Sequence, residues 1–132
     1  MNEFTTKWQP TVLSLLRFVT GLLFLQYGLA KLLKWPPVPM FEKVELFSLY
    51  GAAGSFELVG GILLVLGLFT RPVAFIVSGE MAFAYFMGHA PRGLFPIINN
   101  GGLAILFCFV FLYLAFSGGG PISLDAMLRK KS

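Results

Sequence analysis

Long apolar runs, separated by short polar or proline-containing connections, make up most of the chain. Four runs can be drawn, at about residues 11–33, 52–69, 73–88 and 97–116. Each approaches the ~20 residues that an α-helix needs to cross a bilayer, although the third run is short. No run sustains the alternation of a β-strand, and backbone groups inside hydrocarbon must be satisfied within their own segment. We therefore expect four transmembrane helices.

The connections between the runs carry turn signals. The first is KWPPVPMFEKVELFSLYG, in which the prolines end the first helix and MFEKVELF predicts a short helix at the membrane interface. The turn TRP joins the second and third runs, and Pro72 suits the first turn of a helix. The pattern predicts a single domain over residues 1–132. This domain is an all-α bundle of four transmembrane helices with both termini on the same side and a short polar C-terminal tail.

The composition strengthens the membrane interpretation. Hydrophobic residues make up 57% of the chain and charged residues 12%, whereas about a quarter of the residues of a soluble domain are charged. The basic residues flank the apolar runs and form no stripe interleaved with stacking aromatic residues. We therefore expect a lipid bilayer, and no nucleic acid, as partner. The single cysteine, Cys108, cannot form an internal disulfide.

The distribution of basic residues predicts an orientation. Four spans place both termini and the TRP turn on one side of the membrane. The basic residues of that side are Lys7, Arg71, Arg129, Lys130 and Lys131. Those of the opposite side are Lys31, Lys34, Lys43 and Arg92. The small excess on the first side predicts cytoplasmic termini under the positive-inside rule.

Two predicted helices gather small and ionisable residues on one face. On the first helix the residues of this face are Arg17, Gly21, Phe24, Gly28 and Lys31. On the second helix they are Gly54, Glu57, Gly61 and Leu64. Small residues let neighbouring helices approach closely in lipid, so both faces should point into the bundle.

Depth along the helices predicts a first polar layer near the end of the bundle that holds the termini. At a rise of ~1.5 Å per residue, Arg17 and Glu80 fall at similar depths. We predict a structural ion pair between them, which would join the first helix to the third. Breaking a buried pair of this kind typically costs about 3–5 kcal/mol.

A second polar layer is predicted around Glu57. No basic residue is expected at its depth, so its carboxyl group is either protonated and hydrogen-bonded to Gln26 or Tyr85, or contacted by Lys31 from above. An ionisable group inside a membrane is a functional candidate. The predicted catalytic residues are Glu57 and His89. The predicted ligand-binding residues are Lys31, Gln26, Tyr85, Asn99 and Asn100.

The same residues have structural interpretations. Lys31 can extend to the headgroups, His89 lies near a helix end, and Asn99 and Asn100 can cap the fourth helix. His89 is the only histidine, and no Cys/His ligand spacing is present, so we expect no metal site. No haem or flavin site is visible in the sequence either.

Five segments, in order along nearly the whole chain, carry a family resemblance. They are RFVTGLLFLQYGLAKL, FELVGGILLVLGLFTRPVA, MGHAP, NNGGLAIL and GGGPISLDAML. Together they resemble the DoxX family of small four-helix membrane proteins. The recurrent polar residues of that family fall on Arg17, Lys31, Glu57, Arg71, His89, Asn100, Ser123 and Asp125.

The resemblance implies a multi-pass protein of the bacterial-type cytoplasmic (inner) membrane. Some relatives are subunits of quinone-reducing enzymes, and others are associated with oxidative-stress systems. One hypothesis is therefore a quinone-like cofactor bound in the second polar layer, in the membrane subunit of an oxidoreductase whose partner protein supplies electrons. The alternative is a non-enzymatic membrane scaffold or small-molecule-binding module. A proton-coupled carrier is a third hypothesis, which would need a homo-oligomer because four short spans leave little room for alternating access.

Overall fold

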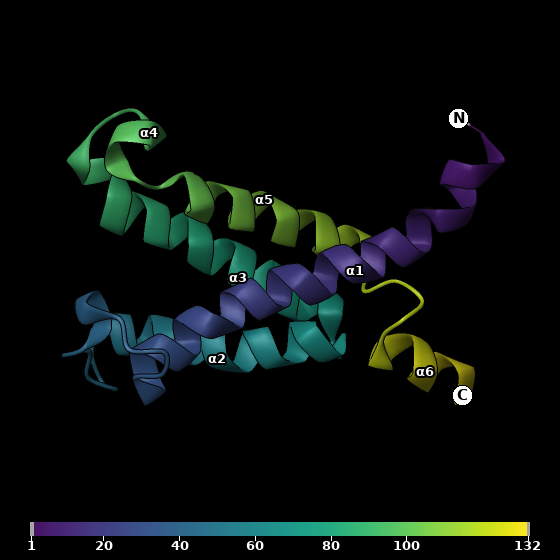
Figure 1. The fold of residues 1–132 in the computed structure, drawn as a ribbon, viewed down its shortest axis with the longest axis horizontal. Coiled ribbons are helices and arrows are strands. Elements are labelled where there is room, and N and C mark those ends of the chain that lie inside the picture. The colour runs from purple at the N-terminus through teal and green to yellow at the C-terminus, as the bar shows by residue number, and fades with distance from the viewer. Residues whose placement is uncertain (1, 132) are drawn as a thin grey trace.

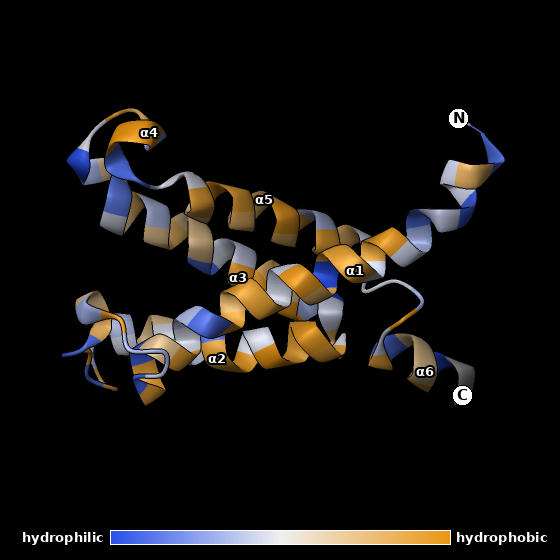
Figure 2. Cartoon of the chain, in the orientation of Figure 1, coloured by the Kyte–Doolittle hydropathy of each residue, from blue (hydrophilic) through white to orange (hydrophobic). Residues whose placement is uncertain are grey.

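The chain folds entirely into helices and connections over residues 2–131, which the computed structural model describes. Three segments are long and apolar enough to cross a membrane: Glu3–Leu33, Leu49–Leu66 and Thr70–Arg92. A fourth apolar helix, Gly102–Ser117, has 16 residues. The protein is therefore an all-helical, multi-pass membrane protein, and Figure 2 shows that apolar residues dominate all four of these helices.

The helices follow one another along the chain as labelled in Figure 1. The α-helices are α1 (Glu3–Gly28), α2 (Leu49–Leu66), α3 (Thr70–Ala84), α4 (Pro96–Asn99), α5 (Gly102–Ser117) and α6 (Leu124–Lys131). A π-helical turn, Leu29–Leu33, continues α1, and a second one, Tyr85–His89, continues α3. Short 3₁₀ turns occupy Pro39–Phe41 and Ala90–Arg92.

Two local predictions are wrong. The predicted interfacial helix at MFEKVELF is only the 3₁₀ turn Pro39–Phe41, because the Lys34 ammonium group donates to the Phe41 and Val44 carbonyls, at 2.9 and 2.7 Å, and holds this segment as a loop. The predicted fourth run is divided into α4 and α5. It breaks at Asn100, whose left-handed backbone (φ 60°) ends α4. Asn tolerates this conformation better than most residues because its short polar side chain can bond locally.

Small residues let α1 and α2 pack closely, as the face analysis predicts. Gly28 lies against the backbone of Leu58. A Cβ atom added at Gly61 would lie 2.7 Å from the Cα atom of Leu25. The ionisable residues Arg17 and Glu57 are buried on these same faces. The predicted inward orientation of both faces is confirmed.

The bundle consists of two helix pairs, α1 with α2 and α3 with α5. The second pair is joined by a hydrogen bond from the Ser78 hydroxyl to the Cys108 carbonyl, at 2.7 Å. The two pairs meet at a core whose central ring is Phe24, and this ring makes edge contacts with Phe107 and Phe111 at 5.5 and 4.9 Å between centroids. Towards the end where α4 lies, α2 and α3 diverge (Figure 1).

The C-terminal segment lies at the other end of the bundle, beside the turn between α2 and α3. Figure 1 shows α6 there, at the same end as the start of α1. Asp125 links α6 to the turn, because its carboxylate accepts from the backbone N–H groups of Phe69 and Thr70 at 2.8 and 2.9 Å. This carboxylate caps the start of α3.

Candidate functional site

A cavity of about 400 Å³ lies between the two helix pairs, at the end where α2 and α3 diverge. Residues of α1, α2, α3 and α5 line it, together with the first connection, and most of them are apolar. The polar and ionisable residues among them are Tyr27, Lys31, Tyr50, Glu57, Glu80, His89, Arg92 and Asn100. The cavity is thus an apolar space with a few polar groups, which is the usual character of a small-molecule site.

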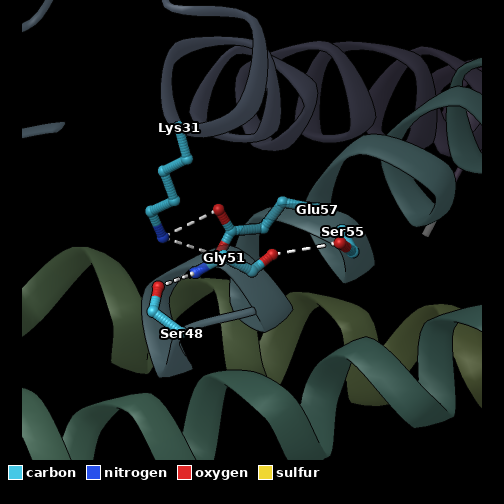
Figure 3. A network of polar contacts seen from close by, with 5 residues as sticks. All are labelled: Lys31, Ser48, Gly51, Ser55 and Glu57. Atoms are coloured by element: carbon cyan, nitrogen blue, oxygen red, sulfur yellow. Dashed lines mark hydrogen bonds and ion pairs between the residues drawn. The ribbon is translucent and has the colours of Figure 1, made fainter. Parts of the chain in front are cut away.

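Lys31 and Glu57 form an ion pair inside this cavity (Figure 3). The Lys31 Nζ atom lies 2.9 Å from Oε1 of Glu57 and donates a hydrogen bond of 3.0 Å to Oε2. Lys31 is 8% exposed and Glu57 is 2% exposed, so the pair is shielded from solvent. Of the two alternatives for Glu57, contact with Lys31 from above is therefore confirmed.

Local structure brings the two groups together. Lys31 lies in the π-helical turn that follows α1, and its Cβ atom passes 3.0 Å from the position that a Cβ of Gly54 would take. Ser48 caps the start of α2, where its hydroxyl accepts from the N–H of Gly51 at 3.0 Å (Figure 3). The glycine and the capped start of α2 thus let the Lys31 ammonium group reach Glu57.

Glu80 contributes a second carboxyl group to the same cavity. Its Oε1 atom is buried, and no hydrogen bond reaches this atom within the part of the chain that the structure describes. The cavity therefore contains one ammonium group paired with Glu57 and an additional acidic group. A buried polar atom without a partner is costly, and it marks a place where a ligand group or a proton would be stabilised.

The predicted ion pair between Arg17 and Glu80 is wrong. The Arg17 guanidinium donates instead to four carbonyl groups, those of Leu64, Val65, Gly119 and Ile122. The similar depths of Arg17 and Glu80 do not bring the two side chains together. The reason is that α1 packs on α2 and the Arg17 side chain turns to the C-terminal end of α2 and the tail. Arg17 is a structural residue, and Glu80 is free to line the cavity.

The predicted residues around the end of α3 separate into two groups. His89 and Asn100 line the cavity. Tyr85 and Asn99 lie outside its lining, where the Asn99 amide donates to the Tyr85 hydroxyl at 3.0 Å and accepts from the N–H of Gly101 at 2.8 Å. Asn99 therefore ties the end of α3 to the start of α5. Its own carbonyl also bonds to Nδ1 of His89, at 3.0 Å, and orients the imidazole ring.

The prediction that Gln26 lies beside Glu57 is wrong, because its side chain is exposed. The neighbouring Tyr27 lines the cavity instead. Tyr27 precedes Lys31 by four residues, so helical spacing alone could have identified it. Arg92 was also missed as a lining residue, because residue pattern does not predict the position of the 3₁₀ turn Ala90–Arg92 at the cavity.

A second hollow, also of about 400 Å³, lies beside the α2–α3 turn and the tail. Two of its charged side chains already have protein partners: Asp125 caps α3, and Arg71 donates to the Phe116 carbonyl. Partial burial raises the pKa of the Asp125 carboxyl group, but the N–H donors of Thr70 and Phe69 and the nearby charge of Arg129 outweigh this effect. The pKa of Asp125 therefore lies below its ordinary value, as expected for a structural cap.

Comparison with known proteins gives two matches. Residues 12–90 match the family model described as DoxX. A Haemophilus influenzae protein described as an uncharacterized protein is 44% identical to this chain over an alignment of 136 residues. The alignment covers 95% of this chain and 96% of the relative. No solved structure matches the chain. The region matched by the family model contains Lys31, Glu57, Glu80 and His89, four of the polar residues that line the cavity.

Proposed function

Since the chain belongs to the DoxX family of membrane proteins, we propose that it binds a small lipophilic molecule of the quinone class in the cavity around Lys31, Glu57 and Glu80. The cavity volume of about 400 Å³ supports this proposal, because small-molecule sites measure roughly 300–1,000 Å³. Aromatic and aliphatic walls suit a hydrophobic ring. The few polar groups suit a head group that carries oxygen atoms.

Each polar side chain has a distinct role in the proposal. Lys31, held by Glu57, donates a hydrogen bond to a ligand oxygen and stabilises negative charge that develops on it. Glu80, whose Oε1 atom has no hydrogen bond within the described chain, exchanges a hydrogen bond or a proton with the ligand. His89 and Glu57 are further groups for proton transfer. As the membrane subunit of a redox system, the protein would supply protons while a partner protein supplies electrons.

The observation that carries this proposal is the buried Oε1 atom of Glu80, without a hydrogen bond among the described residues, in the same cavity as the Lys31–Glu57 pair. If the ionisable residues of the cavity served only to join the helices, the Lys31–Glu57 pair alone would be enough. An additional acidic group in an apolar cavity costs free energy unless something binds to it. A ligand with a polar head would compensate this cost.

Titration with decylubiquinone, after reconstitution in lipid nanodiscs, tests the proposal. We expect saturable binding by the wild type and a roughly tenfold or greater loss of affinity in Lys31→Met, because hydrogen bonds to charged groups contribute about 1.5–3 kcal/mol. Glu80→Gln should also weaken binding. Glu3→Gln removes an exposed carboxylate at the start of α1 and serves as the matched control, with unchanged affinity.

The alternative function, a membrane scaffold without a ligand, is supported by the carbonyl network of Arg17, which joins three parts of the chain. The same titration separates the two. Absence of saturable binding by the wild type, or equal affinity in all four proteins, would overturn the quinone proposal and favour the scaffold.

A further inference from the structure

Exposed apolar side chains line the cavity where α2 and α3 diverge, and this side indicates how a ligand would be shaped. We infer that its ligand is a tailed molecule dissolved in the membrane, with its head at Lys31 and Glu80 and its hydrocarbon tail leaving between α2 and α3, past Phe56 and Phe83. The inference rests on the proposed function for the head group. It adds the class of ligand and the route by which it enters.

The side of the cavity between α1 and α5 is closed by aromatic rings. Tyr27 of α1 meets Phe107 of α5 edge-on, with 6.3 Å between ring centroids. Phe24 adds a second contact with the same ring, at 5.5 Å. Phe24 is 1% exposed and Phe107 is 6% exposed, so this wall is packed.

The side between α2 and α3 has a different structure. Near the turn the two helices touch, and a Cβ atom added at Gly60 would lie 2.9 Å from Cγ1 of Val77. Further along the helices, Phe56 and Phe83 line the cavity, yet they are 49% and 55% exposed. Among the described residues no ring contact joins these two side chains. Side chains that both line a cavity and face outward mark its rim.

The chemistry of this rim favours hydrocarbon over water. Leu49 and Met87 share the property of lining the cavity while more than half exposed, and they extend the rim along the same two helices. These four residues are apolar. Further exposed residues also line the cavity, in or beside the first connection and on either side of α4: Met40, Tyr50, Arg92 and Asn100. Phe56 lines the same cavity as Lys31 and Glu57, so this side of the cavity leads to the ion pair. A tail placed here remains among lipid chains and gives up little of its apolar environment, whereas a water-soluble ligand gains nothing from such an opening.

Quenching by brominated lipid tests the opening without any added ligand. The reporter is the indole of Tyr27→Trp, on the cavity wall, in a chain that also carries Trp8→Phe, Trp35→Phe and Cys108→Ala. A bulky maleimide is attached after folding to Phe83→Cys, at the rim, or to Phe75→Cys. Phe75 is also on α3 and 63% exposed but does not line the cavity, so it is the matched control.

In nanodiscs of dibrominated phosphatidylcholine, we expect acyl chains to enter and quench the indole. Labelling Phe83→Cys should reduce this quenching at least twofold relative to the unlabelled sample of the same variant, and labelling Phe75→Cys should not change it. Equal quenching with and without the label at position 83 would overturn the inference.

A second measurement uses quinones of the same ring with and without a tail. The label on Phe83→Cys should slow the association of decylubiquinone roughly tenfold. The association of the tailless ubiquinone head group should be slowed less. Equal slowing of the two quinones would contradict a route for the tail between α2 and α3. If the wild type binds neither quinone, the proposed function fails, and the lipid-quenching result alone decides whether the opening exists.

Discussion

Lys31 and Glu57 neutralise each other inside the cavity, whereas Glu80 has a buried oxygen atom that no described group contacts. The three residues therefore differ in what they do for the fold. The pair stabilises the α1–α2 contact because each charge is the main partner of the other. Glu80 has no hydrogen bond to its buried oxygen among the described residues, so its conservative replacement isolates a ligand-binding role.

Lys31→Met should destabilise the protein by about 3–5 kcal/mol, because it leaves the buried Glu57 carboxylate without its partner. Glu57→Leu added to Lys31→Met should recover most of this loss by removing the orphaned charge. Denaturant titration in detergent, followed by circular dichroism, measures both changes. Glu80→Gln is the control and should stay within about 1 kcal/mol of the wild type. A Lys31→Met protein as stable as the wild type would contradict the assignment of Lys31 and Glu57 as a buried, stabilising ion pair.

At the scale of helices, two kinds of contact join the elements: close backbone approach at glycines, and side chains that bond to helix ends. The α1–α2 contact is of the first kind, with Gly61 against Leu25. The contact of α6 with the start of α3 is of the second kind, through Asp125.

Gly61→Ala should destabilise the α1–α2 contact by about 1–3 kcal/mol, because the new Cβ atom would lie 2.7 Å from Cα of Leu25. Gly79→Ala in α3 is the matched control. No atom lies within 4 Å of the position of its Cβ, so this substitution should leave stability unchanged or raise it by about 0.5–1 kcal/mol. Thermal unfolding of the two variants in detergent measures the difference, and similar melting temperatures would contradict close packing at Gly61.

Asp125→Asn should cost about 0.5–2 kcal/mol at neutral pH, the usual range for losing a helix cap. Because the pKa of Asp125 lies below its ordinary value in the folded protein, its charge stabilises the fold above the unfolded pKa of ~3.9. This stabilisation is lost as the pH falls through the lower, folded pKa. Unfolding measured from pH 7 to pH 3 should therefore show the difference between wild type and Asp125→Asn hold at neutral pH and decrease at the acidic end. A difference that stays constant over that range would contradict the cap.

The helical faces of α1 and α2 could be predicted from the sequence, because glycines and ionisable residues recur there with helical spacing. The partners of Arg17 could not. Its acceptors are backbone carbonyls, two of them in the irregular segment around Gly119 and Ile122, and neither side-chain type nor periodicity identifies such groups. The prediction for Gln26 was wrong by one residue. Successive residues of a helix point ~100° apart, so Gln26 is exposed while Tyr27 lines the cavity.

At the scale of the whole molecule, the membrane character follows from the four apolar helices, while the number of crossings and the side of the termini are still predictions. We propose four crossings with cytoplasmic termini, in the bacterial inner membrane. The two helix pairs and the position of α6 at the same end of the bundle as the start of α1 are compatible with an even number of crossings (Figure 1).

In the Cys108→Ala background, Thr5→Cys near the start of α1 and Lys43→Cys in the first connection test this topology. Both positions are exposed. A membrane-impermeant maleimide added to intact cells should label Lys43→Cys only, and should label Thr5→Cys after the cytoplasmic side is made accessible. Labelling of Thr5→Cys in intact cells would place the N-terminus outside.

Arg17 depends on the last part of the chain for two of its four acceptors, the carbonyls of Gly119 and Ile122. During synthesis, the first helix is therefore made long before the groups that satisfy its guanidinium exist. Until the segment around Gly119 and Ile122 is made, the buried guanidinium has only the Leu64 and Val65 carbonyls of α2 as acceptors. We expect a protease that recognises loosely packed membrane segments to degrade a chain ending before Gly118 faster than the complete one, because the shorter chain lacks both acceptors in the tail.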